Sequence, residues 1–262
     1  MKFTKMHGLG NDFVIIDAIN QTIDNKKLPI AKLSNRYTGI GFDQLLMVGP
    51  SKKADFFCRI FNSDGSQAEQ CGNGLRCIAR FIHERGLHCN KAFSIETIAG
   101  IFPITIEDYN HIQVTMGAPH IVEKLIEFAM DQYAKKIPVS ILSIGNPHTI
   151  INTAAIDQSL IDQLGPAIST HSSFPNGTNV GFMQIINPHH IRLRTFERGA
   201  GETHACGSNA CAAVVAGMSN QWLKEKVNVE FRYGVLSVEW NGTTGLIYLT
   251  GPAEHVFDGV IV

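Results

Sequence analysis

Two cysteines in this sequence stand in matching surroundings that could make them reactive. Cys71 begins the stretch CGNGLRC and Cys206 begins the stretch CGSNAC, and a run typical of a helix follows each of them. A helix N-terminus presents unpaired backbone N–H groups and the positive end of the helix dipole, so it lowers the pKa of a thiol placed there. The sequence therefore predicts two thiols that can ionise, each at the start of a helix.

A pair of such thiols suits one kind of reaction. Inversion of a stereocentre by proton transfer needs a base on one face of the carbon and an acid on the other, and the reverse reaction exchanges the two roles. We expect Cys71 and Cys206 to face one another across a cleft, with a substrate carboxylate held at the helix N-termini. The α-hydrogen of an amino acid is very weakly acidic, so N–H donors must stabilise the enolate-like carboxylate that forms.

The chain repeats itself, which explains why the two cysteines match. Phe61 and the Cys71-Gly72 pair recur as Phe196 and Cys206-Gly207, and Gly10-Asn11 recurs as Gly145-Asn146, all 135 residues later. Gly100 and Gly117 recur 134 residues later as Gly234 and Gly251, and GFDQ at 41–44 matches GFMQ at 181–184 with an offset of 140. We expect two copies of one domain with short insertions, the first formed by 1–118 plus 252–262 and the second by 119–251.

Within each copy, short β-rich runs alternate with turn residues, as strands do. The segment after Cys71 instead places Leu75, Ile78, Ala79 and Ile82 at helical spacing, with Gly86 as the expected stop. The run 210–216 is apolar all round, so the helix that it predicts must be enclosed by other structure. We expect an α+β fold in which each domain is a strongly curved sheet around a central helix. The predicted strands are 13–17, 44–48, 56–61, 93–97 and 112–116 in the first copy, and 148–152, 180–186, 191–196, 227–231, 236–240 and 246–250 in the second.

Composition excludes several classes of protein. The 22 basic and 23 acidic residues give a formal net charge of −1. The sequence therefore lacks the excess of positive charge that binding to nucleic acid or an anionic membrane requires. The first residues, MKFTKMHGLGND, lack the apolar region of a secretion signal, and no run of about 18 apolar residues predicts a membrane span. We expect a soluble, cytoplasmic protein that acts on a small molecule.

The other cysteines and the glycine-rich segment have simpler interpretations. The six cysteines are expected to be thiols, and Cys58, Cys77, Cys89 and Cys211 to be small buried packing residues. Their spacings do not favour a structural zinc site, and we expect no metal. HGLGND lacks the third glycine of a dinucleotide fingerprint, so nucleotide binding is not expected.

The motifs resemble those of the diaminopimelate epimerase family. MHGLGNDFVIID, FNSDGSQAEQCGNGLRCIARF, SIGNPH, FPNGTNV and FERGAGETHACGS are similar to that family's signature segments and occur in its order along nearly the whole chain. The resemblance implies two pseudo-symmetric α+β domains, each a β-barrel-like sheet around a central helix, with the active site between them. It also implies a homodimer and cofactor-independent interconversion of LL- and meso-diaminopimelate, a step in lysine and peptidoglycan precursor biosynthesis.

The resemblance also assigns roles, motif by motif. Cys71 and Cys206 would be the two acid/base groups, and His148 and Glu197 would tune the thiols. Gly72, Asn73, Gly207 and Ser208 would offer N–H groups to the reacting carboxylate. The rest of the substrate would be bound by Asn11, Gln44, Asn62, Asn146, Asn179, Glu197 and Arg198. A second amino acid centre requires amides and a charge of each sign, and an arginine can hold its carboxylate bidentately.

Two positions depart from the family pattern. Asn209 stands where glycine usually follows the second Cys-Gly-Ser, which puts the shape of that turn in doubt, although asparagine tolerates unusual backbone angles. Phe257 stands where a tyrosine is often found, so a dimer contact at that position would lack a hydroxyl. The sequence does not tell which thiol is ionised at rest, how far the domains close, or whether a dimer is required.

Two rival functions stay open at this point. A proline or hydroxyproline racemase has a similar fold and also uses two cysteines, but a small cyclic substrate would not need the set Asn11, Asn62, Asn179 and Arg198. An isomerase-like binding protein without activity is the second rival, and the loss of a cysteine would be its sign. Both cysteines are present.

Overall fold

A computed structural model describes residues 1–23, 28–130, 135–242 and 245–261. The chain divides into two compact units, Met1–Thr115 with Thr250–Val262, and Met116–Leu249. We call them unit 1 and unit 2. No helix within the described ranges is both long enough and apolar enough to cross a membrane.

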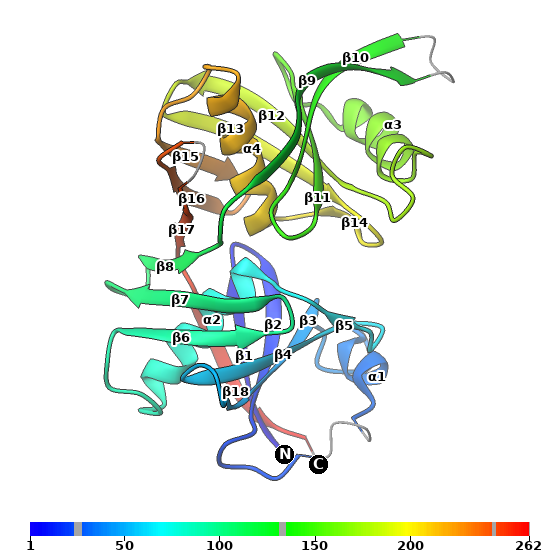
Figure 1. The fold of residues 1–262 in the computed structure, drawn as a ribbon. Helices are drawn as coiled ribbons and strands as arrows, with labels where there is room; N and C mark the ends of the chain where they lie inside the picture. Colours follow the sequence, from blue (N-terminus) through cyan, green and yellow to red (C-terminus); the bar gives the residue numbers. More distant parts are fainter. Residues whose placement is uncertain (24–27, 131–134, 243–244, 262) are drawn as a thin grey trace. The chain divides into compact units, whose positions relative to one another are not determined.

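Unit 1 is a mixed sheet wrapped on one long helix (Figure 1). β1 pairs antiparallel with β18 and β2, β2 is parallel to β3, and β3 pairs antiparallel with β4. β4 carries the short β5 and runs parallel to β6, from which β7 and β8 follow antiparallel. The elements are β1 (Lys2–Gly8), β2 (Asn11–Asp17), α1 (Ile30–Ser34), β3 (Gln44–Pro50), β4 (Phe56–Asn62), β5 (Gln67–Ala68), α2 (Gly72–Glu84), β6 (Ala92–Thr97), β7 (Gly100–Ile106), β8 (Ile112–Thr115) and β18 (Glu254–Val260).

Unit 2 repeats this plan. β10 pairs antiparallel with β9 and β11, β11 is parallel to β12, and β12 pairs antiparallel with β13. β13 carries the short β14 and runs parallel to β15, which pairs antiparallel with β16. The elements are β9 (His120–Met130), β10 (Lys135–Ser143), β11 (Pro147–Asn152), α3 (Gln158–Ser169), β12 (Asn179–Asn187), β13 (His190–Glu197), β14 (Gly201–Thr203), α4 (Gly207–Ser219), β15 (Lys226–Phe231), β16 (Gly234–Trp240) and β17 (Ile247–Gly251).

The equivalence extends to single residues. Phe13 pairs with Gln44 between β2 and β3, and His148 pairs with Asn179 between β11 and β12, which is the same pairing 135 residues later. Gly100 and Gly234 begin β7 and β16 with φ of 143° and 144°, a backbone region that favours glycine. The α+β fold with two pseudo-symmetric halves is therefore confirmed.

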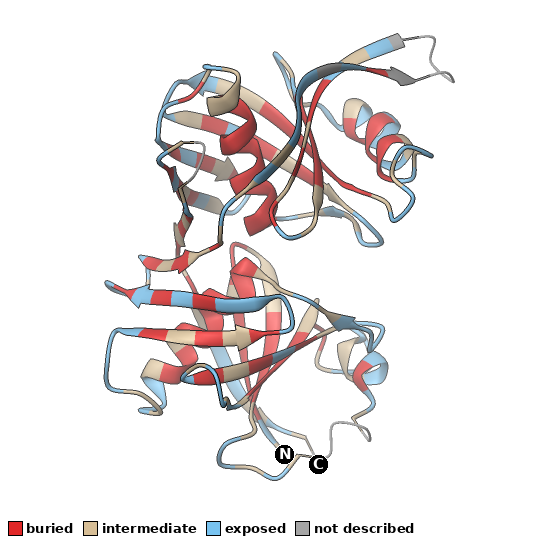
Figure 2. Cartoon of the chain, in the orientation of Figure 1, coloured by how far each residue is buried: buried red, intermediate tan, exposed pale blue. Residues whose placement is uncertain are grey.

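A central helix is the core of each unit, and Figure 2 shows both of these helices largely in the colour of buried residues. Ten residues of α2 are buried, among them Leu75, Ile78 and Ile82, and every residue of α4 from Gly207 to Gly217 is buried. α2 packs against β1, β2, β3, β7 and β8, while α4 packs against β10–β13 and β16. An all-apolar helix enclosed by its own sheet is what the sequence of 210–216 predicts.

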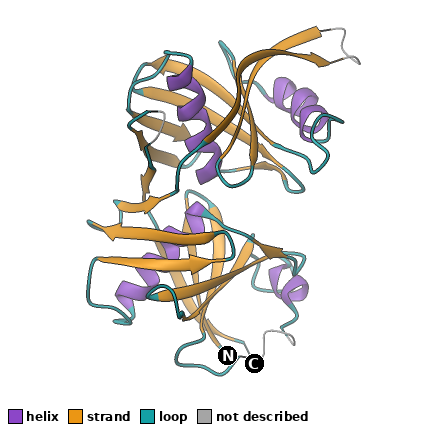
Figure 3. Cartoon of the chain, in the orientation of Figure 1, coloured by secondary structure: helices purple, strands orange, loops and turns teal. Residues whose placement is uncertain are grey.

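Each predicted strand is confirmed, with ends that differ by at most two residues (Figure 3). The sequence patterns left helices α1 and α3 unassigned, along with the strands β1, β5, β7, β9, β10, β14 and β18. Pro103 in β7 and Pro138 in β10 weaken the strand signal, and β18 alternates little because its residues are half-buried or exposed.

The structure corrects two sequence-based interpretations. The offset of 140 between GFDQ and GFMQ is wrong, because Gln44 begins β3 and Asn179, not Gln184, begins β12. The segments GFDQ and GFMQ are alike by chance. The register of the strands requires no insertion between the copies at this point. Cys89 is also exposed rather than buried, because it lies in the turn between α2 and β6, whereas Cys58, Cys77 and Cys211 are buried as expected.

Candidate active site

The predicted site residues of unit 1 gather at one edge of its sheet, next to the start of α2. Asn11 begins β2, Gln44 begins β3, and Asn62 ends β4. β3 is parallel to β2 and antiparallel to β4, so these three positions meet at the same edge. We call the set Asn11, Gln44, Asn62, Cys71, Gly72 and Asn73 the first cluster.

Cys71 is the N-cap residue of α2. Its extended backbone (φ −152°, ψ 107°) directs the side chain back over the first turn, where the Gly74 N–H donates to Sγ at 3.4 Å. The Cys71 thiol also donates to Oδ1 of Asn11, with 3.7 Å between sulfur and oxygen. Gly72 and Asn73 follow in the first turn, where a helix has no intrahelical acceptor for backbone N–H groups. The predicted thiol at a helix start is therefore present.

Asn11 and Asn73 form a short amide chain beside this thiol. Nδ2 of Asn73 donates to Oδ1 of Asn11 at 3.2 Å, and Oδ1 of Asn73 accepts from Arg76 at 2.9 Å. The guanidinium of Arg76 is fully buried and also donates to the carbonyl oxygens of Gly72 and Pro252. These contacts fix the orientation of both amides, with the NH2 group of Asn73 toward the oxygen of Asn11 and the oxygen of Asn73 toward Arg76.

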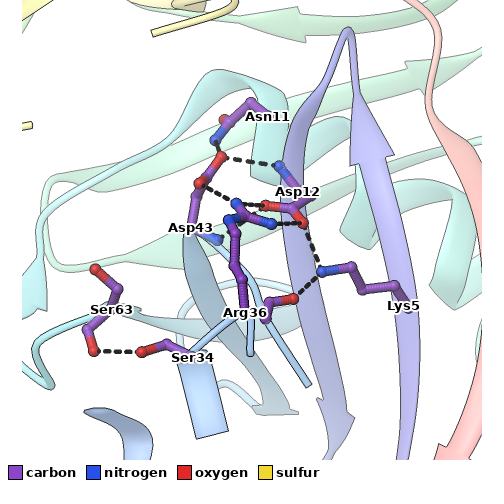
Figure 4. Close-up of polar contacts among 8 residues, drawn as sticks. Lys5, Asn11, Asp12, Ser34, Arg36, Asp43 and Ser63 are labelled. Carbon is purple, nitrogen blue, oxygen red and sulfur yellow. Dashed lines mark hydrogen bonds and ion pairs between the residues drawn. The ribbon is translucent and has the colours of Figure 1, made fainter. Parts of the chain in front are cut away.

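An ionic network supports the other side of Asn11, as Figure 4 shows. Nδ2 of Asn11 donates to Asp43 at 2.9 Å, and Arg36 bridges Asp43 and Asp12. Lys5 also donates to Asp12. Burial raises the pKa of Asp12, but the hydrogen bonds and charges of Arg36 and Lys5 outweigh it and lower that pKa to about 2. Asp12 is therefore ionised at neutral pH and ties β1 and β2 to the loop before β3.

Gln44 and Asn62 lie opposite one another on neighbouring strands. Nε2 of Gln44 donates to Oδ1 of Asn62 at 3.0 Å, and Nδ2 of Asn62 donates to Ser66 at 3.0 Å. Oε1 of Gln44 is buried without a hydrogen-bond partner among the described residues. A buried carbonyl oxygen of this kind is suited to accept an ammonium or amide donor from a ligand.

The predicted site residues of unit 2 occupy the equivalent edge. Asn146 precedes β11, Asn179 begins β12, Glu197 ends β13, and Cys206 is the N-cap of α4. Each stands 135 residues after a member of the first cluster, namely Asn11, Gln44, Asn62 and Cys71. We call the set Asn146, His148, Asn179, Glu197, Arg198, Cys206, Gly207 and Ser208 the second cluster.

Cys206 differs from Cys71 in its immediate contacts. Its side chain makes no capping hydrogen bond with the helix, and its Sγ lies 3.4 Å from Oγ of Ser208. Asn209 occupies the position that Gly74 has in unit 1. Its Nδ2 donates to the Val180 carbonyl at 3.2 Å, while its Oδ1 is buried without a partner among the described residues. The departure at Asn209 thus leaves α4 intact and fastens its first turn to β12.

His148 is fully buried in β11. Burial, and to a smaller extent the charge of Arg198, lower the pKa of His148 to about 3, so the imidazole is neutral at physiological pH. Its Nε2 lies 2.9 Å from the amide oxygen of Asn146, an acceptor, so Nε2 carries the proton. Nδ1 then holds the lone pair, and it has no hydrogen-bond partner among the described residues. A neutral histidine with this lone pair can accept a hydrogen bond at Nδ1, while its low pKa opposes its own protonation.

Asn179 joins the two sides of the second cluster. Its Nδ2 donates to the Pro147 carbonyl at 3.1 Å, and its Oδ1 accepts from the backbone N–H of Arg198 at 3.0 Å. Arg198 is exposed and donates to the Asn176 carbonyl at 2.8 Å. Oε1 of Glu197 accepts from the Thr203 hydroxyl. Hydrogen bonds and strand pairing therefore connect Asn146, His148, Asn179 and Arg198. Glu197 directly precedes Arg198 and ends β13.

Sequence reasoning missed the residues that hold the first cluster in place, above all Asp43, Arg36 and Arg76. Asp43 lies directly before Gln44 in GFDQ, and Arg76 lies one turn after Gly72 in CGNGLRC. The position of Arg76 between the apolar residues Leu75 and Cys77 is the one signal that could have pointed to a buried cation. The described residues contain no group of three histidine, cysteine or acidic side chains that could hold a metal ion.

Comparisons with known proteins place this geometry among isomerases. A family model described as diaminopimelate epimerase matches residues 3–122 and 140–256, which include both clusters. The fold is similar to that of a phenazine biosynthesis protein of the PhzF family from Bacillus anthracis, with a TM-score of 0.75 at 19% identity, covering 100% of this chain and 99% of that one.

Two further solved structures share the fold. One is a hydroxyproline epimerase from Agrobacterium vitis, with a TM-score of 0.75 at 14% identity, covering 99% of this chain and 91% of that one. The other is a probable proline racemase from Agrobacterium radiobacter K84, with a TM-score of 0.76 at 15% identity, covering 100% and 92%. At these identities the likeness establishes a common fold and not a common substrate.

Proposed function

Because the chain belongs to the diaminopimelate epimerase family, and is therefore of the epimerase and isomerase class, we propose that it interconverts LL- and meso-diaminopimelate. In this proposal Cys71 and Cys206 are the two acid/base groups, and no cofactor takes part. The observation that carries the proposal is the placement of each cysteine as the N-cap residue of a central helix, in two units of the same topology.

The reaction is a proton exchange at one α-carbon. One cysteine, as thiolate, removes the α-proton and becomes a thiol, while the electron pair of the C–H bond moves toward the carboxylate. The other cysteine, as thiol, donates its proton to the opposite face of the carbon and becomes a thiolate. The reverse reaction exchanges the roles, so that no net proton is consumed. Two groups of the same chemistry at equivalent positions are suited to this reversibility.

The developing negative charge needs stabilisation, because the α-hydrogen of an amino acid is a very weak acid. Backbone N–H groups of Gly72 and Asn73, and of Gly207 and Ser208, lie in the first turns of their helices. Such donors, together with the positive ends of the helix dipoles, stabilise an enolate-like carboxylate. We assign the reacting carboxylate to these first turns.

The second amino acid centre of the substrate would be recognised by the strand-edge residues. Asn11, Gln44, Asn62, Asn146 and Asn179 supply amide donors and acceptors, and Glu197 and Arg198 supply a charge of each sign. The equivalents of His148 and Arg198 in unit 1 are Phe13 and Ser63. We therefore assign the distal carboxylate to Arg198, and the tuning of the thiols to the neutral His148 with Glu197.

The decisive experiment follows hydrogen exchange in heavy water. LL-diaminopimelate and the reduced protein should give meso product with deuterium at one α-carbon, without added pyridoxal phosphate, as seen by NMR and mass spectrometry. Absence of exchange at neutral pH with both thiols reduced would contradict the proposal.

The same experiment with proline and hydroxyproline tests the nearest alternative. Exchange of proline with no exchange of diaminopimelate would support a proline racemase, and exchange of neither would support a binding protein. The amide-rich strand edges and Arg198 favour diaminopimelate, since the smaller ring offers no second amino acid centre for them to bind. We further propose a cytoplasmic homodimer acting in lysine and peptidoglycan precursor biosynthesis, which gel filtration and growth complementation would test.

A further inference from the structure

The side chain of Asn11 is held from both ends. Its Nδ2 donates to Oδ2 of Asp43 at 2.9 Å, and its Oδ1 accepts from Asn73 at 3.2 Å and from the Cys71 thiol at 3.7 Å. An ionised carboxylate only accepts hydrogen bonds, so the amide must turn its NH2 group to Asp43. Its oxygen is thereby directed at Cys71.

Asp43 in turn is held by three donors that use both of its oxygens. Oδ2 accepts from Asn11 and from the backbone N–H of Asp12 at 3.2 Å, and Oδ1 accepts from Arg36 at 2.7 Å. Arg36 also binds both oxygens of Asp12, so the guanidinium fixes the two carboxylates relative to each other (Figure 4). The loop that carries Asp43 is thus locked to the start of β2.

The oxygen of Asn11 affects the protonation of Cys71. A thiol can donate to an amide oxygen but a thiolate cannot, so this contact favours the protonated form. The N–H of Gly74, which donates to the same sulfur, favours the thiolate. The orientation of the Asn11 amide therefore decides whether its contact with Cys71 acts with or against the contact from Gly74.

We propose that Asp43, held by Arg36, is a positioning residue that orients Asn11 and thereby sets the protonation balance of Cys71. Its effect on turnover rests on the proposed function, whereas its effect on the thiol does not. Neither Asp43 nor Arg36 has to touch the substrate for this role.

Asp43→Asn is a close test because the shapes of the two side chains match. An amide has one oxygen, so Asn at position 43 cannot accept from both Arg36 and Asn11. Its NH2 group must face one of these donors, and Asn11 loses its fixed orientation. We expect the Cys71 pKa to fall by about one unit, since the acceptor for the S–H is lost. Misplacement of Asn11 should lower kcat/KM by about 10-fold to 100-fold.

The pKa of Cys71 is measured through the rate of iodoacetamide alkylation against pH, with the modified peptide identified by mass spectrometry. Cys58 and Cys77 are the thiols whose pKa values Cys71 influences, and burial raises both of those values well above the usual range. They stay protonated and unreactive over the range used. The other charged group of α2 near Cys71 is Arg76, which is unchanged in the variant.

Asp17→Asn is the matched control, because Asp17 ends the same strand that Asn11 begins, and the donors to its carboxylate among the described residues, Ile19 and Asn20, are local. Its alkylation midpoint and kcat/KM should equal those of the wild type. Arg36→Lys should have an intermediate effect, since a lysine retains the charge but not the bidentate hold.

The outcomes separate cleanly. A folded Asp43→Asn variant with the alkylation midpoint and kcat/KM of the control would overturn the proposal. Should Asp43→Asn fail to fold, Arg36→Lys decides, because the Arg36 side chain is 54% exposed and its replacement is tolerated by the core. An unchanged midpoint in that variant overturns the proposal. If the wild type does not epimerise diaminopimelate, the proposed function fails, and the alkylation midpoints still test the role of Asp43.

Discussion

Cys71 and Cys206 are equivalent in the backbone but different in their contacts. The Cys71 sulfur accepts from the N–H of Gly74, whereas Asn209 at the equivalent position of unit 2 bonds to β12 and Cys206 lies beside the hydroxyl of Ser208. An N–H donor stabilises a thiolate, and a hydroxyl can either donate or accept. The two equivalent thiols therefore differ in their surroundings, and in the proposed exchange one of them would be a thiolate while the other is a thiol.

The first prediction concerns these two residues. Cys71→Ala and Cys206→Ala should each lower kcat for epimerisation by at least about 100-fold, since each removes one of the two proton carriers. Turnover is measured by the change in optical rotation or by chiral chromatography. Cys89→Ala, at an exposed turn, is the control and should keep wild-type turnover. Ordinary turnover in either of the first two variants would refute the two-base assignment.

The second prediction concerns His148. Its folded pKa of about 3 lies below the ordinary value of 6.5, so the unfolded chain binds a proton that the folded chain does not as the pH falls through this window. The stability that neutral His148 contributes is thus fully present above pH 6.5 and is lost toward pH 3. Between pH 7 and pH 5 the free energy of unfolding should fall by about 2 kcal/mol from this residue.

Urea denaturation at the two pH values measures this loss. His148→Asn should lose less stability than the wild type between pH 7 and pH 5. His111→Asn is the control, because His111 is exposed and its pKa is raised by Asp108 rather than lowered. That variant should show a decline at least as large as that of the wild type, since a raised pKa adds stability as the pH falls. Equal declines in His148→Asn and in the wild type would show that the imidazole is not held neutral.

At the scale of elements, α4 and β12 approach one another unusually closely. A Cβ added to Gly181 of β12 would lie 2.4 Å from Oδ1 of Asn209 and 2.7 Å from Cδ1 of Ile150. Both neighbours are buried and cannot move aside without disturbing the core. Asn209 therefore requires glycine at position 181, and the two positions are coupled.

A double-mutant cycle tests this coupling. Gly181→Ala should destabilise the protein by about 2 kcal/mol, because overpacking a core costs energy of this order. Asn209→Ala removes a buried oxygen that has no partner among the described residues, but it also removes the hydrogen bond to Val180, so it should destabilise the protein alone and still recover part of the Gly181→Ala loss in the double variant. Gly49→Ala, with open space around the position, is the control. Strict additivity of the two free-energy changes would contradict the coupling.

At the scale of the whole molecule, the repeat supplies the two like groups that the proposed reaction would use. Strand pairing, helix position and the N-cap cysteine recur at an offset of 135 residues, so one local solution supplies both thiols. The two units differ where the repeat has diverged, with His148 and Arg198 in place of Phe13 and Ser63. In the proposed function, the equivalent cysteines would transfer the proton, and the positions that differ between the units would bind the distal end of the substrate.

The last prediction rests on the proposed function, in which both thiols would reach one α-carbon. Mild oxidation should inactivate the enzyme by joining Cys71 to Cys206, because thiols on opposite faces of one carbon are close to disulfide distance. Peptide mapping before and after reduction measures the bond, and dithiothreitol should restore turnover. Complete inactivation with both thiols still reduced would argue against it.

Local features of the sequence were enough to identify the two cysteines as helix-capping residues and to predict the helices that they cap and most of the strands. Caps, helical spacing and strand alternation depend on residues a few positions apart, so they can be seen without the fold. Repetition of Cys71-Gly72 as Cys206-Gly207 then indicated a pair of sites. The offset of 140 failed for the opposite reason, since a four-residue likeness carries no information on strand register.

Only the tertiary structure decided how the clusters are held and charged. The neutrality of His148 follows from complete burial and from Arg198, which is 50 positions away in the chain. The orientation of Asn11 depends on Asp43 and Asn73, and the fit of Asn209 depends on Gly181. Desolvation, amide orientation and close packing are properties of neighbours in space, and the chain brings those neighbours together only when it folds.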